Sequence, residues 1–159
     1  MSQIIDFYSG KKNLKYSYKD VENFNDSQWE NYHDFIQIVF PNREPSQHNP
    51  DAPLLTDEDL KILQEQYPLY VEDMVDYYMS FLGFLSCSYK GIRYYLQDNE
   101  DNISRVTHLN HNTLRITRLL KFLREFNQEL CTAVFYTLIS QDISLDIDLD
   151  YWIKAYKGE

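Results

Sequence analysis

The hydrophobic positions between residues 108 and 126 repeat with the period of an α-helix. After a polar start, and at about 100° per residue, one arc carries the apolar side chains Ile116, Leu119, Leu120, Leu123 and Phe126. His111, Arg115 and Arg118 share a second arc, and Arg115 lies at the edge of the first. The pattern therefore predicts a helix in which a histidine and two arginines border the buried stripe.

Capping signals and a proline predict the helices before this segment. Residues 4–9 have the pattern of a short helix. Ser27 and Glu30 fit a capping box, in which the serine oxygen accepts a backbone N–H and the glutamate bonds back to the N-cap. We therefore expect a helix from Ser27 to Phe40, and Pro41 ends it because proline cannot continue a helix.

A second capping box, Thr56 with Asp59, predicts the start of the next helix. Pro68 interrupts that helix and suits the first turn of another, whose dense apolar sequence runs to about residue 85. Two further helices are expected at about 129–140 and 150–156. Without an internal repeat or a linker, these elements predict one compact, multi-helix, all-α domain over residues 1–159.

Composition agrees with such a domain. Hydrophobic residues make up 43% of the chain and aromatic residues 16%, so it can bury enough apolar surface to offset the entropy of ordering. No stretch of about 18 apolar residues occurs, which excludes a transmembrane segment. The N-terminus lacks the basic start and apolar run of a secretory signal. We expect a soluble, cytoplasmic protein, and export through a non-cleaved signal stays an open alternative.

The charge balance argues against nucleic acid as a partner. With 25 acidic and 15 basic residues, the chain carries a formal charge of −10. Phosphate binding needs a concentrated basic face, which this balance makes costly.

Only two cysteines occur, Cys87 and Cys131, and their spacing matches no zinc motif. Their apolar surroundings favour two buried thiols in a reducing compartment, while the sequence leaves a disulfide between them open.

Four segments carry a family resemblance: YHDFIQIVFPNREP, APLLTDEDL, MSFLGFL and HNTLRITRLLKFL, in that order. Together they resemble the conserved-region domain of the opioid growth factor receptor family, which is unrelated to membrane-spanning opioid receptors. Ile38 and Asn42 depart from the family pattern, where a Trp and an apolar residue are expected. The resemblance implies a fold and a ligand-binding role, in the family for a short opioid peptide. It supplies no catalytic residue, and we do not transfer the nuclear localisation of the longer animal receptors.

Arg115 and Arg118 are the leading candidates for a binding site. The guanidinium is a planar fork matched to carboxylates and phosphates, and a helix N-terminus nearby also favours anions. The alternative is that both arginines pair with internal acids, for example Asp34 or Glu44, and fix the packing of the helices.

His33, Gln37 and Arg43 form a second candidate group. His33 borders the apolar arc of its predicted helix, with Gln37 one turn later. The histidine either contacts a ligand or bonds to a neighbouring backbone group. Arg43, in a proline-flanked corner, either lines the rim of a pocket or pairs with a charge elsewhere in the domain.

No metal or other cofactor is expected. His108 and His111 have a spacing that two metal ligands on a helix can share, but the asparagines around them are typical of a helix start. The alternating aspartates at 146, 148 and 150 lack the glycine and the bidentate glutamate of a calcium loop.

These observations favour a non-catalytic module that binds a peptide or an acidic small molecule. The predicted contact residues are His33, Gln37, Arg43, His111, Arg115 and Arg118. The alternative is an enzyme that uses the same cluster on a phosphate- or carboxylate-bearing substrate, with histidine transferring a proton and arginine clamping the anion. The sequence does not specify an oligomeric state.

Overall fold

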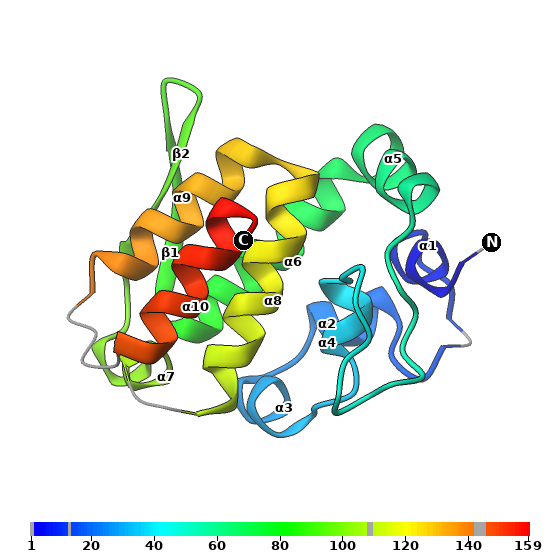
Figure 1. Ribbon diagram of the computed structural model, residues 1–159, viewed down its shortest axis with the longest axis horizontal. Helices are drawn as coiled ribbons and strands as arrows, with labels where there is room; N and C mark the ends of the chain where they lie inside the picture. Colours follow the sequence, from blue (N-terminus) through cyan, green and yellow to red (C-terminus); the bar gives the residue numbers. More distant parts are fainter. Residues whose placement is uncertain (1, 13, 108–109, 142–145) are drawn as a thin grey trace. The chain divides into compact units, whose positions relative to one another are not determined.

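Helix α5 (Asp57–Gln66) begins at the predicted capping box. Thr56 Oγ1 accepts the N–H of Asp59 at 3.1 Å, and the Asp59 carboxylate accepts the N–H of Thr56 at 3.4 Å. Pro68 then opens α6 (Pro68–Leu82), where its missing N–H falls in the first turn. Both predicted helix starts are confirmed in the computed structural model, which describes residues 2–12, 14–107, 110–141 and 146–159 (Figure 1).

The expected single helix from Ser27 to Phe40 is wrong. The chain instead forms α3 (Asp26–Asn31) and α4 (Ile36–Val39). Tyr32, which follows α3, has an extended backbone with ψ of 132° and ends the first helix.

The predicted cap of α3 is also wrong, because Asn25 caps the helix and Ser27 lies inside its first turn. Asn25 Oδ1 accepts the N–H of Gln28 at 2.8 Å, and the Gln28 side chain accepts the N–H of Asn25 at 2.9 Å. Asparagine and serine cap helices about equally well. The helix therefore begins at the capping box formed by Asn25, which comes first in the chain.

We expect Asn25→Ala to lower the free energy of unfolding by about 1 kcal/mol, because the mutation removes the side-chain acceptor for the first turn of α3. Ser27→Ala is the matched control and is expected to change stability by less than half as much. Urea denaturation of both variants measures the difference. A larger loss of unfolding free energy for Ser27→Ala than for Asn25→Ala would show that Ser27 caps the helix.

The described residues pack as two compact units, Met1–Tyr77 and Tyr78–Glu159. Each is described by itself, and a single domain over residues 1–159 remains a prediction. In the first unit, α1 (Gln3–Tyr8) packs against α4 and α5. Tyr8 Oη donates to the Val39 carbonyl at 2.5 Å, and Ser2 Oγ donates to Asp59 at 2.6 Å.

The first unit also contains α2 (Tyr18–Glu22), which has its own capping box between Ser17 and Asp20. Tyr18 Oη donates to the Tyr70 carbonyl at 3.2 Å and so ties α2 to the first turns of α6. Beside it lies an aromatic cluster with ring centroids 5.2–6.1 Å apart, formed by Tyr16, Phe24, Trp29, Tyr32 and Phe35.

The second unit contains a β-hairpin that was not predicted from the sequence. Helix α6 ends at Leu82, and Gly83 with φ of +105° leads into β1 (Phe84–Tyr89). The antiparallel partner is β2 (Ile92–Gln97), joined to β1 by Lys90 and Gly91, both with positive φ. Two consecutive positive φ values are the mark of the type I′ turn that suits a tight hairpin.

A short 3-10 helix (Glu100–Asn102) follows the hairpin, and further α-helices come after it in the described residues of this unit. They are α7 (Ser104–Thr107), α8 (His111–Phe126), α9 (Gln128–Ile139) and α10 (Asp146–Lys157). Helices α8, α9 and α10 pack against one another, and β2 packs against α9 (Figure 1). The last helix is longer than predicted.

Over the part of the chain that the structure describes, the fold is therefore mostly helical with a small antiparallel sheet, and the all-α prediction is wrong in this respect. The hairpin was missed because the expected helix ran to about residue 85 and so included the start of β1, and no element was predicted for the rest of the hairpin. Among the described residues, no helix combines the length and the apolar sequence needed to span a membrane.

Candidate functional site

Helix α8 places His111, Arg115 and Arg118 in one row. Asn110 caps the helix, its Oδ1 accepting the N–H of Asn112 at 2.8 Å. The three side chains follow one another at intervals of four and three residues, so they lie on one side of the helix and span about 10 Å of its axis. The predicted second arc of this helix is thus present.

Burial distinguishes the members of this row. Arg115 keeps only 5% of its surface exposed, whereas His111 and Arg118 are half-buried. Burial also lowers the pKa of Arg118, because desolvation disfavours the charged guanidinium. Both arginines are therefore withdrawn from water, Arg115 almost completely.

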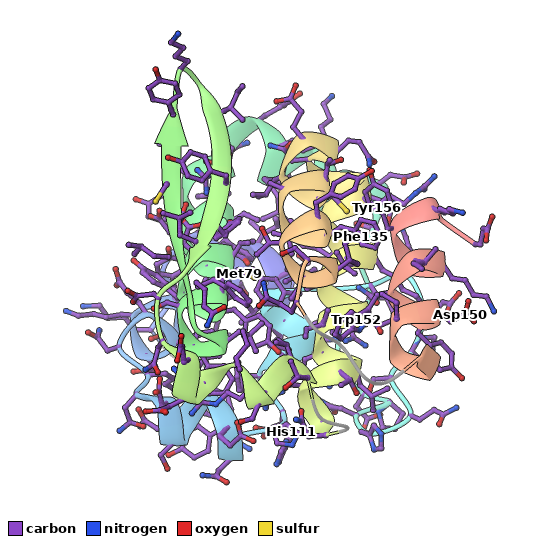
Figure 2. The ribbon with its side chains drawn as sticks, turned by 90° about the vertical axis from the view of Figure 1, so that its left-hand side faces the viewer. Met79, His111, Phe135, Asp150, Trp152 and Tyr156 are labelled. Atoms are coloured by element: carbon purple, nitrogen blue, oxygen red, sulfur yellow. The ribbon has the colours of Figure 1, made fainter. Side chains whose placement is uncertain are left out.

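The surrounding helices hold α8 in place at its first turn. Tyr78 Oη on α6 donates to Asn112 Oδ1 at 3.1 Å, in the buried interior. Trp152 Nε1 on α10 donates to the Thr113 carbonyl at 3.0 Å. Figure 2 shows Trp152 between α10 and α8, away from His111 at the start of α8. These two buried hydrogen bonds fix the segment that carries the row.

Helices α9 and α10 are joined by a pair of stacked aromatic rings. Phe135 stacks on Tyr156 with ring centroids 4.1 Å apart and planes 2° from parallel (Figure 2). Thr132 Oγ1 and Tyr156 Oη lie 3.0 Å apart in a hydrogen bond. Because α10 also bonds to α8 through Trp152, this contact braces the helix that supports the row.

His33, Gln37 and Arg43 belong to the other unit. His33 is exposed in the segment between α3 and α4, while Gln37 is buried and accepts a long hydrogen bond of 3.4 Å from Asn49. Arg43 Nη1 lies 2.7 Å from Asp57 Oδ1, so this arginine forms an ion pair at the start of α5.

Asp34, one of the two acids named as internal partners for the arginines, bonds to Lys15. That hydrogen bond holds the pKa of Asp34 below its usual value. The six predicted contact residues thus form two groups of three, one in each unit.

The two cysteines differ in burial. Both cysteines are free thiols. Cys131 is buried as predicted, but the prediction is wrong for Cys87, which is only half-buried because it lies in the β-hairpin. Burial raises the pKa of Cys131 to about 12, so this group stays a thiol at neutral pH. Within the described ranges, no three His, Cys, Asp or Glu side chains are grouped to hold a metal ion. His108, the other member of the pair with His111, lies outside the described residues.

Sequence reasoning missed an exposed apolar surface on the β-hairpin. Leu85, Tyr89, Ile92, Tyr94 and Leu96 each keep 39–69% of their surface exposed. The signal was present as two alternating apolar runs separated by Lys90–Gly91, a pattern typical of a hairpin.

A comparison with known protein families identifies the family of this chain. A family model described as the opioid growth factor receptor (OGFr) conserved region matches residues 4–154, which is nearly the whole chain. No curated protein and no solved structure matches this chain. The match covers all four segments that carry the resemblance, including the α8 sequence with Arg115 and Arg118. The chain therefore belongs to the opioid growth factor receptor conserved-region family.

Proposed function

We propose that this chain is a non-catalytic recognition module whose helix α8 binds an anionic ligand, a peptide or an acidic small molecule. The observation that carries the proposal is the row of His111, Arg115 and Arg118 with its desolvated guanidiniums. Arginine binds carboxylates and phosphates through two parallel N–H bonds. A charge partner counts for more where water is scarce, because screening is weaker there.

The two arginines have different roles in this proposal. Arg118 is the ligand contact, because it is half-buried and retains an accessible part of its side chain. Arg115, at 5% exposure, holds the row in place from the interior. His111 stands one turn before Arg115, near the N–H groups of the helix start, where an anion is also favoured.

His33, Gln37 and Arg43 are proposed as a second set of ligand contacts on the first unit. His33 is exposed, and Arg43 keeps 39% of its side chain exposed while one nitrogen pairs with Asp57. Gln37 is buried and acts through its bond from Asn49. Single alanine substitutions at these positions measure their contribution separately from that of α8.

The absence of catalysis is proposed on the chemistry of the side chains. The buried Cys131 thiol has a pKa of about 12 and is a poor nucleophile. The sequence carries no nucleophile-elbow, zinc-protease or phosphate-loop motif. We therefore propose that the arginines of α8 bind an anion and that no reaction follows.

Thermal unfolding in the presence of ligands tests the proposal. The family resemblance supports a short opioid peptide as the first probe, and the same peptide with an amidated C-terminus is the matched ligand that lacks the carboxylate. Inorganic phosphate is the third probe. A ligand at about 100 times its dissociation constant stabilises the protein by about 2.7 kcal/mol. We expect stabilisation by the free acid, and little or none by the amide.

Arg118→Leu is expected to abolish this stabilisation. Arg124→Leu is the matched control, since Arg124 lies on the same helix but is exposed. Equal stabilisation by the acid and the amide, or equal loss in both arginine variants, would contradict anion recognition by α8.

A further inference from the structure

One face of the β-hairpin is apolar and exposed. The strand register pairs Leu85 with Leu96, Cys87 with Tyr94, and Tyr89 with Ile92. Alternate residues of a strand point to the same side of a sheet, so these three pairs share one face. We call it the outer face; it consists of Leu85, Cys87, Tyr89, Ile92, Tyr94 and Leu96.

The opposite face attaches the hairpin to its unit. Phe84 keeps 1% and Tyr95 keeps 7% of its surface exposed, so both are buried. Strand β2 packs against α9, and the turn of the hairpin extends beyond the ends of the neighbouring helices α8, α9 and α10 (Figures 1 and 2). The exposed hydrophobic side chains are therefore not needed to hold the hairpin in place.

Charge is distributed unevenly along the hairpin. The segment from Phe84 to Gln97 contains two basic residues, Lys90 and Arg93, and no acidic residue, in a chain of net charge −10. Lys90 lies in the turn, whereas Arg93 lies beside it on the opposite face with Tyr95; the positive charge at the turn end of the outer face is therefore that of Lys90. The chain that leaves β2 at the other end carries three exposed acids: Asp98, Glu100 and Asp101. A six-residue strand separates the two ends by about 20 Å.

We propose that the outer face is the contact surface between two copies of this chain, related by a twofold axis near Cys87 and Tyr94. The two hairpins then run antiparallel, so the basic turn of each copy meets the acidic base of the other. A twofold contact uses the same patch on both subunits and must be self-complementary. The hairpin meets this condition, because its centre is apolar and its ends carry opposite charge.

The size of the outer face fits this partner. With roughly 200 Å² for a large side chain, its five large hydrophobic residues expose about 500 Å². Contact between two such faces buries about 1,000 Å² in total, the lower end for a specific interface. Charge also favours this face, because the hairpin carries no acidic residue in a chain of net charge −10.

Sedimentation equilibrium of the wild-type protein and of Leu96→Glu tests the proposal. We expect the wild type to approach twice its monomer mass, and Leu96→Glu to weaken the self-association at least about tenfold. Leu69→Glu, which changes a hydrophobic residue with 69% of its surface exposed on α6, is the matched control and should associate normally. Circular dichroism verifies that both variants fold.

Charge reversal tests the antiparallel arrangement. Lys90→Glu and Asp98→Lys should each weaken the dimer, because each places like charges opposite one another. Both substitutions on the same chain should restore it, since the new glutamate of one copy meets the new lysine of the other. Additive weakening by the two substitutions would overturn the arrangement.

Cys87 supplies an independent measurement. Packed sheets lie about 10 Å apart, so the two Cys87 side chains near the axis should be joined by a short bismaleimide. Cys131 is fully buried and does not compete, and Cys87→Ser should abolish the product. Three results would overturn the proposal: a monomer up to about 100 µM, association that is insensitive to Leu96→Glu, or a wild type that stays monomeric and binds anionic vesicles through the same face.

Discussion

Gly83→Val is expected to lower the free energy of unfolding by about 3–5 kcal/mol, the range of the most damaging single substitutions. Gly83 has φ of +105°, a backbone angle that residues other than glycine rarely adopt. A Cβ at this position would lie 2.7 Å from the Asn99 carbonyl oxygen and 3.1 Å from Asn102 Cβ. The carbonyl of Gly83 accepts the N–H groups of Asp98 and Asn99 at 2.8 and 3.2 Å. Relief of the clash therefore breaks the contacts that close the base of the hairpin.

Gly91→Val separates the two contributions to this loss. Gly91 also has a positive φ, of +77°, but a Cβ there meets no atom within 4 Å. The control therefore carries backbone strain without the clash, and we expect it to cost about 1–2 kcal/mol. Urea denaturation at low protein concentration measures both variants. Equal losses would show that strain alone, and not the close approach to Asn99, makes Gly83 necessary.

The helix starts that depend on local chemistry could be predicted from the sequence. Thr56 with Asp59, and Pro68, each act within one turn of helix, so their effect does not depend on the rest of the fold. The same logic failed at Ser27, because Asn25 offers an equivalent cap two residues earlier. Where two capping boxes overlap, the local signal does not decide between them.

The hairpin shows the limit of periodicity. The residues around Gly83 are apolar without interruption, and a short apolar run suits a buried helix end or a strand equally well. The alternation of apolar and polar residues that identifies β1 begins only after Phe84, where Ser86 and Ser88 separate the apolar residues. Lys90–Gly91 was the better guide, since a glycine in a two-residue link between alternating runs is typical of a hairpin.

The row on α8 was predictable in geometry but not in burial. A helix fixes which residues share a face, so the sequence alone could align His111, Arg115 and Arg118. How deeply each is covered depends on tertiary packing, and the arginine at the edge of the apolar arc proved to be 5% exposed. The partners of such residues come from distant parts of the chain, which helical periodicity does not reveal.

Arg115→Leu is expected to lower the free energy of unfolding without ligand by about 3–5 kcal/mol, whereas Arg118→Leu should cost no more than about 1 kcal/mol. Arg115 is 5% exposed, and a guanidinium so deeply buried is kept in place by groups that compensate its charge and its N–H donors. Removal of one member of such a set leaves the others buried without their partner. Arg118 is half-buried, and desolvation already lowers its pKa, so its replacement by an apolar side chain relieves part of that cost.

Urea denaturation of the two variants without ligand gives the comparison, and Arg115→Lys gives the control. Lysine keeps the charge but lacks the planar fork, so an intermediate loss indicates that the geometry of the guanidinium matters as well as its charge. A loss above about 3 kcal/mol in both leucine variants would remove the anion site from α8, because both arginines would then serve the interior. A small loss at Arg115 would instead add it to Arg118 as a ligand contact, and the two should then act together in the peptide assay.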